Sequence, residues 1–304
     1  MHAWPPAFVP DGTLLYGPHC MASRSFPGLV ARLIAFGILL VGAILAIGVA
    51  GTLQSPVVVE AELAVPGLPP GTEIRAVHLT DIHTSWPDMP RRRLESIVER
   101  VNALEPDLIL LTGDHFGGKI WALEAYPIED ALDPLKALSA PLGVVAVRGN
   151  HDDHWVLMRL RRLGTIKVLV NAHVDLGPIV IVGLDSAKYG PDLDRAVAGV
   201  PAGKPVIGLV HEPEVTEWLP PQGWPMVAGH THGGQVHLPL LGAPWAWFQG
   251  RFPCRRGNCE VNGWDLFVSS GLGTSILPIR IGVRPEIVVL RLYGPSGRKS
   301  GTEK

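Results

Sequence analysis

The sequence has few cysteines and few charged residues, and each shortage excludes a class of protein. Three cysteines in 304 residues exclude a disulfide-rich scaffold, and Cys20, Cys254 and Cys259 lack the CxxC spacing of a structural zinc site. Lys and Arg number 26 against 28 Asp and Glu, so no basic excess can neutralise many phosphates, and we expect no nucleic-acid partner. Charged residues are 18% of the chain and hydrophobic residues 47%, which excludes a disordered chain and indicates a membrane segment.

One long apolar run accounts for much of this hydrophobicity. Residues 33–51 read LIAFGILLVGAILAIGVAG without a charge, and their 19 residues would span about 28 Å as a helix, close to a bilayer core. We therefore predict a transmembrane helix over 29–51, with a cleaved secretory signal as the alternative. Arg24 and Arg32 precede the run, whereas the first basic residue after it is Arg75. The positive-inside rule then places the rest of the chain on the outer, periplasmic face of the inner membrane.

The remaining sequence divides by composition into four further regions. Residues 1–28 are rich in Pro, Gly and aromatics without periodicity, and no fold is expected there; Met21 is an alternative start. Residues 52–72 predict a Pro-rich linker with one edge strand at 57–60. The folded domain is expected over 73–293, followed by a flexible tail at 294–304.

The folded domain reads as an α/β fold with two sheets. In its first half, apolar runs predict strands at 74–79, 108–111 and 144–147, and amphipathic patterns predict helices at 90–104, 128–138 and 153–163. This alternation predicts a parallel sheet built from βαβ units. The second half predicts strands at 179–184, 206–210, 226–228, 266–268 and 287–292 with few helices. We expect these strands to form a second sheet that packs on the first.

Polar clusters follow the predicted strands at the positions where each strand ends. Asp81 and His83 follow the first strand, Asp114 the second, and the motif GNHD, with Asn150 and His151, the third. The second half adds His211 and the segment AGHTHGGQ, with His230 and His232. Ligand sites of parallel sheets form at the carboxyl ends of strands, so these residues should meet in one crevice. Each motif alone is also typical of a turn, a helix cap or a buried histidine, but the full set predicts a metal site.

The order DIH, GD, GNHD, a lone His and GHTHGGQ resembles the calcineurin-like metallophosphoesterase family over about residues 73–292. The resemblance implies a four-layer α/β/β/α sandwich of two mixed sheets. It implies one metal held by Asp81, His83, Asp114 and His232, and a second held by Asp114, Asn150, His211 and His230, with Asp114 as the bridge. Mn is favoured among Mn, Fe and Zn. The run GDHFGG lacks the further Asp and Arg of many family members, which argues against a protein Ser/Thr phosphatase.

The segments GGQVHLPL and GLGTSILPIRIGVRPEI, with the single apolar helix, resemble membrane-anchored bacterial phosphoesterases. These include UDP-2,3-diacylglucosamine hydrolases of lipid A biosynthesis. The resemblance implies a phosphodiesterase or pyrophosphatase acting on a lipid-linked or nucleotide-sugar substrate, although such cytoplasmic substrates conflict with an outer-face domain. The alternatives are an exported hydrolase of soluble phosphoesters and a noncatalytic metal-binding scaffold, which the complete ligand set disfavours.

The mechanism expected from this ligand set uses a metal-bridging hydroxide as the nucleophile. His151 is the candidate acid for the leaving oxygen, and His115 and Arg280 are candidate substrate contacts. The aromatic segment with Trp245, Trp247, Phe248 and Phe252 would form either an acyl-chain groove or ordinary core. Outside the cytoplasm, Cys254 and Cys259 could close a small disulfide loop.

Overall fold

The computed structural model describes residues 26–119, 127–238, 242–243 and 252–295. It begins with helix α1 (Phe26–Leu53), which carries one charged residue, Arg32. Within the described ranges, Gly28–Leu53 is the one helix long and apolar enough to cross a membrane, a description that an anchor and a secretory signal both satisfy. The chain separates into two units, Met1–Ala43 and Ile44–Lys304, so the last turns of α1 belong to the same unit as the folded domain.

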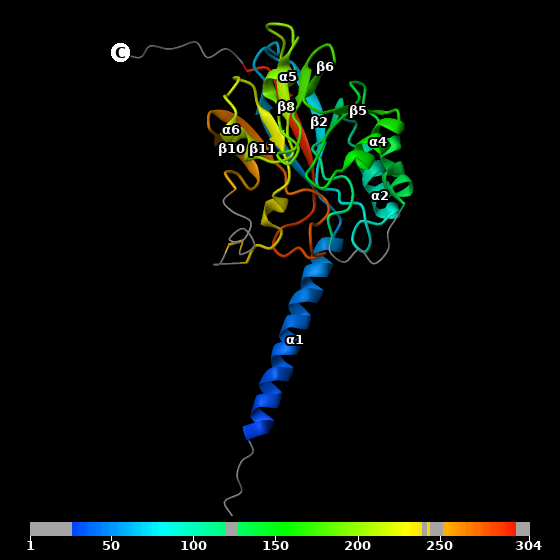
Figure 1. The fold of residues 1–304 in the computed structure, drawn as a ribbon, viewed down its shortest axis with the longest axis vertical. Helices are drawn as coiled ribbons and strands as arrows, with labels where there is room; N and C mark the ends of the chain where they lie inside the picture. The colour runs from blue at the N-terminus through cyan, green and yellow to red at the C-terminus, as the bar shows by residue number, and fades with distance from the viewer. Residues whose placement is uncertain (1–25, 120–126, 239–241, 244–251, 296–304) are drawn as a thin grey trace, which may run out of the picture. The chain divides into compact units, whose positions relative to one another are not determined.

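The folded domain contains two six-stranded mixed sheets (Figure 1). The first sheet has the order β1 (Val57–Ala64), β12 (Glu286–Tyr293), β2 (Glu73–Leu79), β3 (Leu108–Leu111), β4 (Val144–Val147) and β5 (Ile166–Leu169). The second has the order β10 (Gly257–Val261), β11 (Trp264–Val268), β9 (Met226–Ala228), β8 (Val206–Leu209), β7 (Val180–Gly183) and β6 (Ala172–Asp175). Strands β2 to β5 pair in parallel, as do β7, β8 and β9, so their carboxyl ends lie at one edge of each sheet.

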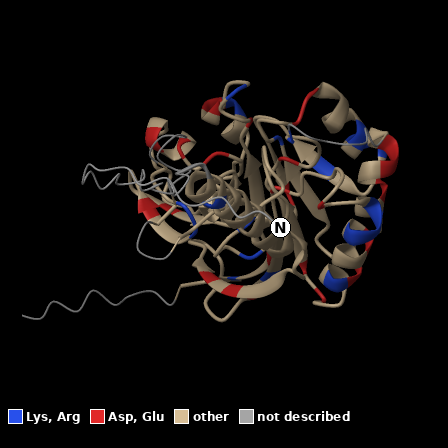
Figure 2. Cartoon of the chain, turned by 90° about the horizontal axis from the view of Figure 1, so that it is seen from below, with Lys and Arg blue, Asp and Glu red and all other residues tan. Residues whose placement is uncertain are grey.

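Three hydrophobic clusters define four layers. Helices α2 (Arg91–Asn102) and α4 (His154–Arg162), with α3 (Ile128–Leu132) and the 3₁₀ helix η1 (Asp133–Ala137), pack on the outer face of the first sheet. The two sheets pack on each other through residues such as Leu110 and Ile207. Short helices α5 (Leu193–Val197) and α6 (Val215–Trp218) cover the second sheet. The predicted α/β/β/α sandwich is therefore confirmed. Lys, Arg, Asp and Glu positions recur along the helices on the right of Figure 2, as expected for amphipathic helices that cover a sheet.

Two segments depart from the sequence-based organisation. The expected linker at 52–72 contains β1, which pairs in parallel with β12, and Leu63, Val65 and Leu68 are buried. This segment therefore belongs to the sheet rather than to a tether. The strand predicted at 287–292 returns to the first sheet as β12 instead of joining the second, because its alternating faces both find apolar partners between β1 and β2.

Two further differences are local. The helix predicted at 128–138 ends as α3 at Leu132 and continues as η1, where Pro134 cannot donate the α-helical hydrogen bond. The short strands β5, β6 and β10 were not predicted, because each has only four or five residues and its apolar run is interrupted by a charged or polar residue. Residues 1–25, 120–126 and 296–304 lie outside the described ranges, as do Trp245, Trp247 and Phe248.

His78 in β2 is a fully buried histidine from which we expect acid sensitivity. Its Nε2 lies 2.7 Å from Thr112 Oγ1, and burial lowers its pKa from 6.5 to about 3. Below pH 6.5, His78 is therefore protonated in the unfolded chain but stays neutral in the folded chain down to about pH 3, so the stability of the folded chain falls as the pH falls. Between pH 8 and pH 5 this one group should cost roughly 2 kcal/mol of unfolding free energy.

The test is denaturant unfolding of the detergent-solubilised protein at pH 8 and pH 5. The variant His78→Gln, which stays neutral, should lose about 2 kcal/mol less than the wild type over this interval. His154→Gln, at an exposed position on α4, is the matched control and should behave like the wild type. An equal loss in all three proteins would contradict the assignment to His78.

Candidate metal centre

Two groups of potential metal ligands lie at the carboxyl ends of the parallel strands. Asp81, His83 and His232 form the first group, and Asp114, His211 and His230 form the second; within each group the ligand atoms lie within 4.8 Å of one another. Asp81 follows β2, and Asp114 follows β3. The histidines of the second group follow β8 and β9 in the other sheet, so the site lies where the two sheets meet.

Asp114 connects the two groups through a single oxygen. Its Oδ2 lies 3.4 Å from Nε2 of His83 and 3.1 Å from Nε2 of His211. Asn150 Oδ1 lies 3.1 Å from the same nitrogen of His211, which brings Asn150 into the second group. On the other side, Nε2 of His232 lies 3.3 Å from both Asp81 Oδ1 and Nε2 of His83. The seven residues predicted as ligands therefore surround two adjoining positions.

The predicted ligands suit metal cations, because hydrogen-bond acceptor atoms of histidine, aspartate and asparagine face one another at both candidate metal positions. His83 donates from Nδ1 to the Gly117 carbonyl at 2.9 Å, and His211 donates from Nδ1 to the Thr112 carbonyl at 2.6 Å. In the neutral form in which histidine binds a metal, Nε2 of each ring is a bare acceptor, and both of these nitrogens face Asp114 Oδ2. Buried Asp81 Oδ1 has no hydrogen-bond donor among the described residues. Divalent cations would satisfy all of these acceptors at once, so the residues fit two metal ions.

The protonation states of His83 and His230 support the same conclusion. Burial lowers the pKa of His83 to about 4 and that of His230 to about 3, so both imidazoles are neutral at pH 7. Burial raises the pKa of Asp81 to about 6, and the nearby Asp114 carboxylate acts in the same direction. For His211 burial opposes the charged form, but the nearby Asp114 carboxylate outweighs it and raises the pKa.

The backbone of the centre is held in an unusual conformation. Asp81, His83, Asp114, His230 and His232 all have left-handed φ angles, between 47° and 69°. Non-glycine residues rarely adopt this region, and such strain concentrates where function requires it. The turn also needs small neighbours. A Cβ at Gly149 would collide with the Asp114 carboxylate, which explains the glycine before Asn150.

The other predicted site residues take different positions. His151 is exposed, with its ring centroid 5.3 Å from that of His83 and its backbone N–H donated to Asp114 Oδ1 at 2.9 Å. His115 is fully buried, with Nδ1 2.8 Å from the Asp152 carboxylate, which also accepts the Gly149 N–H. His115 is thus paired with Asp152 in the loop that also carries the predicted ligand Asn150. A contact between His115 and the substrate remains a prediction.

Arg280 is buried beside the centre, with its guanidinium bonded to backbone. Nη2 donates to the carbonyls of Ser270 at 2.7 Å and Gly273 at 2.6 Å, and Nε donates to Gly273 at 3.0 Å. The same Nη2 lies 3.5 Å from Nδ1 of His232. Backbone carbonyls thus occupy Nε and Nη2, which gives Arg280 a supporting position next to a ligand, whereas Nη1 has no partner among the described residues.

Sequence reasoning missed two charged residues at the centre. Lys119 is buried, and its Nζ contacts the His83 carbonyl at 2.7 Å and Asp88 Oδ1 at 2.8 Å. Glu214 Oε1 lies 3.7 Å from Nε2 of His230. The spacing of Lys119 after the GD motif and of Glu214 after His211 was visible, but side-chain direction decides such contacts and a single sequence does not reveal it.

The comparisons with known proteins agree with this geometry. Residues 74–234, more than half of the chain, match the family model described as calcineurin-like phosphoesterase. The chain belongs to the calcineurin-like phosphoesterase family. An uncharacterized metallophosphoesterase of Campylobacter jejuni is 29% identical, over 80% of this chain and 64% of its own length. A transmembrane protein with a metallophosphoesterase domain from Danio rerio is 30% identical, over 88% and 63%. Metallophosphoesterase YkuE of Bacillus subtilis is 31% identical, over 71% and 76%.

These matches establish the family of the protein but not its substrate. It is a member of the calcineurin-like phosphoesterase family with candidate positions for two metal ions. The alignments span less than two thirds of the Campylobacter and zebrafish relatives. The apolar helix and the name of the zebrafish relative together suggest membrane anchoring.

Proposed function

We propose that this calcineurin-like phosphoesterase is a membrane-anchored dinuclear enzyme that hydrolyses phosphodiester or pyrophosphate bonds. The observation that carries the proposal is the single Asp114 oxygen between two complete ligand groups. Asp81, His83, Asp114 and His232 would hold one ion, and Asp114, Asn150, His211 and His230 the other. When bound, two divalent ions stabilise negative charge on phosphoryl oxygens and lower the pKa of the attacking water.

The protein itself orients these ligands and handles the leaving group. The Gly117 and Thr112 carbonyls fix the tautomers of His83 and His211, so that both Nε2 atoms point to the metal positions. His151 is exposed at the centre and is not a ligand. Its ring is therefore free to donate a proton to the leaving oxygen, while its backbone holds Asp114.

Replacing His151 by Asn should lower kcat by about 10² to 10⁴ on an alkyl phosphodiester. The loss should be much smaller on a nitrophenyl diester, because nitrophenolate leaves without a proton. Metal content should stay at the wild-type value, since the backbone bond to Asp114 remains. Steady-state kinetics with both substrates test the role, and equal losses on the two would exclude a proton donor.

The proposed substrate is lipid-linked or a nucleotide sugar, such as UDP-2,3-diacylglucosamine. Its support is the packing of the last turns of α1 against the loop that carries Arg280, where the Arg280 N–H donates to the Gly48 carbonyl at 2.9 Å. A Cβ at Gly51 would collide with the Arg280 carbonyl, so this approach depends on glycine. Since Arg280 also lies against His232, an anchored α1 would hold the catalytic centre close to the bilayer.

The experiment is hydrolysis by the full chain in nanodiscs, with Mn, Fe, Zn or Mg supplied in turn. A nitrophenyl diester is compared with the matching monoester, and an acylated diester with its deacylated form. Activity on diesters with Mn, raised by acyl chains, supports the proposal. Equal rates with and without acyl chains would favour the exported hydrolase of soluble phosphoesters. Metal binding without hydrolysis of any of these substrates would favour the noncatalytic metal-binding scaffold.

The proposed orientation places the domain outside the cytoplasm of a single-pass protein in the inner membrane. Its support is the disulfide between Cys254 and Cys259, because such bonds persist in oxidising compartments. Protease added to intact spheroplasts should then remove the domain. Protection of the domain until the cells are lysed would reverse the orientation.

A further inference from the structure

A cavity with two arginines in its lining lies next to the ligand His232 of the metal centre. Its volume is about 190 Å³, and its lining residues are Gly233, His237, Arg255, Arg256, Gly282 and Val283. Gly233 directly follows the ligand His232, so the cavity begins one residue from the centre. This space is large enough for a phosphate group.

The charge of this cavity is of one sign. Arg255 and Arg256 are exposed, and no carboxylate lies within 4.0 Å of either guanidinium in the described part of the chain. Among the described residues, no acidic side chain lines the cavity. Both arginines do line it, and two guanidinium groups supply several charged donors, which suits a phosphate.

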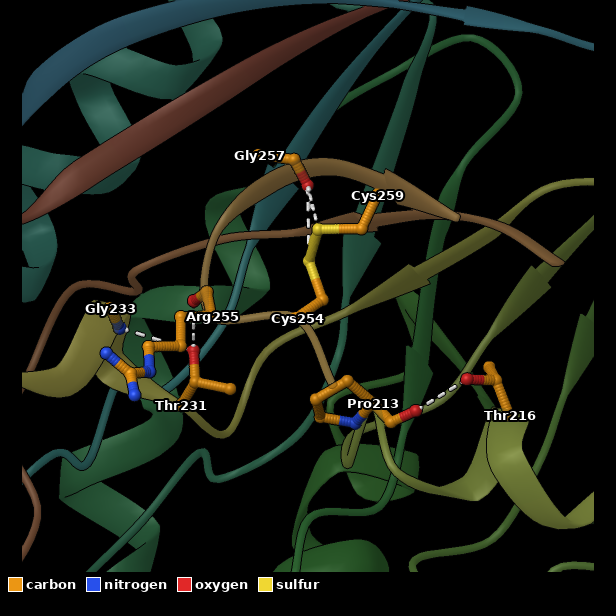
Figure 3. Close-up of a disulfide and its surroundings, with 8 residues drawn as sticks. All are labelled: Pro213, Thr216, Thr231, Gly233, Cys254, Arg255, Gly257 and Cys259. Atoms are coloured by element: carbon orange, nitrogen blue, oxygen red, sulfur yellow. Dashed lines mark hydrogen bonds between the residues drawn. A yellow bond between two sulfur atoms is a disulfide. The ribbon is translucent and has the colours of Figure 1, made fainter. Parts of the chain in front are cut away.

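The wall that carries the arginines is held in place from both ends. The disulfide between Cys254 and Cys259 closes the loop that contains them. The Arg255 carbonyl accepts the hydroxyl of Thr231 at 2.5 Å, and Thr231 stands between the ligands His230 and His232. Figure 3 shows the Arg255 side chain directed from this loop toward Gly233.

The opposite wall is equally constrained. The His237 N–H donates to the Ile281 carbonyl at 2.7 Å, and a Cβ at Gly282 would collide with the His237 carbonyl. This wall continues into Arg280, whose N–H bonds the Gly48 carbonyl of α1. Both walls of the cavity are therefore fixed by backbone contacts. One wall holds Gly233, next to the ligand His232, and the other holds Gly282, two residues from the contact with α1.

We propose that this cavity binds a phosphate group other than the one that is hydrolysed. The inference rests on the proposed function and specifies its site further. The group has two possible sources, a second phosphate within the substrate and the headgroup of a neighbouring anionic lipid. Both present the same oxyanion to Arg255 and Arg256.

The test uses the full chain in nanodiscs and the double variant Arg255→Gln with Arg256→Gln. The matched control is Arg161→Gln with Arg162→Gln, an adjacent exposed pair on α4. Hydrolysis of a diester with a second terminal phosphate is compared with that of the same diester without it. Each substrate is measured in discs of phosphatidylcholine alone and in discs containing phosphatidylglycerol.

If the substrate supplies the phosphate, KM for the bisphosphorylated diester should rise about tenfold or more in the cavity variant, with kcat unchanged, in both disc types. If a lipid supplies it, phosphatidylglycerol should lower KM of the wild type and the control but not of the cavity variant. A cavity variant that matches the wild type in all four conditions overturns the proposal.

A separate measurement distinguishes failure of this site from failure of the proposed function. In chains that carry Asp114→Asn, which removes the shared metal ligand, inorganic phosphate binding is measured by calorimetry with and without the two arginine substitutions. Binding that disappears with the arginines supports the cavity even if no diester is hydrolysed. Binding that is absent, or unchanged by the arginine substitutions, contradicts it.

Discussion

Replacing Asp114 by Asn should lower kcat/KM for a phosphodiester by about three orders of magnitude or more. The ions of such a centre contribute several kcal/mol to charge stabilisation in the transition state, and each 1.36 kcal/mol is a factor of ten in rate. Asp114 Oδ2 faces His83 on one side and His211 on the other, so its charge serves both positions. An amide in its place removes that charge and can offer only one oxygen.

Metal analysis of the same variant separates this explanation from a general loss of structure. Bound metal should fall well below two ions per chain, while the circular dichroism spectrum stays that of the wild type. Asp153→Asn is the matched control, because Asp153 caps α4 by accepting the Val156 N–H, and Asn caps a helix equally well. Full occupancy by two ions in Asp114→Asn would show that Asp114 is not the bridge.

Much of the sandwich could be predicted because its strands are buried on both faces. The runs at 108–111 and 144–147 are wholly apolar, and the structure contains them as β3 and β4 with the same bounds. The return of β12 to the first sheet could not be predicted, because which strand pairs with which is decided by contacts distant in sequence. The two sheets could be predicted from the periodicity of the sequence, but the place of β12 between β1 and β2 is known only from the structure.

The ligand residues could be predicted because each motif stands directly after a strand. The left-handed φ angles at Asp81 and Asp114 could not, because short-range sequence preferences favour other residues there. Which imidazole Asp152 would orient could not be predicted either, since His115 and Asp152 lie 37 residues apart and meet only when the loops after β3 and β4 pack together. The sequence thus predicted which ligand residues meet at the site, but not the backbone conformation or the side-chain pairs that position them.

Replacing Arg280 by Met should destabilise the domain by about 3 kcal/mol or more and should weaken metal binding. The side chain is 1% exposed, and burial lowers its pKa to about 10, so it remains charged at pH 7. Its removal leaves the buried carbonyls of Ser270 and Gly273 without donors, at about 1–3 kcal/mol each. The same loop is tied to Asp81, because the Gly273 N–H donates to the Asp81 carbonyl at 2.7 Å.

The measurement is the unfolding free energy of the detergent-solubilised chain, together with its metal content. Arg284→Met is the matched control, since Arg284 is exposed and makes one long bond of 3.4 Å to the Ser55 carbonyl. A supporting role predicts loss of stability and of metal affinity together in Arg280→Met, and neither in the control. A variant with wild-type stability and metal content but a raised KM would instead assign Arg280 to the substrate, as the sequence first suggested.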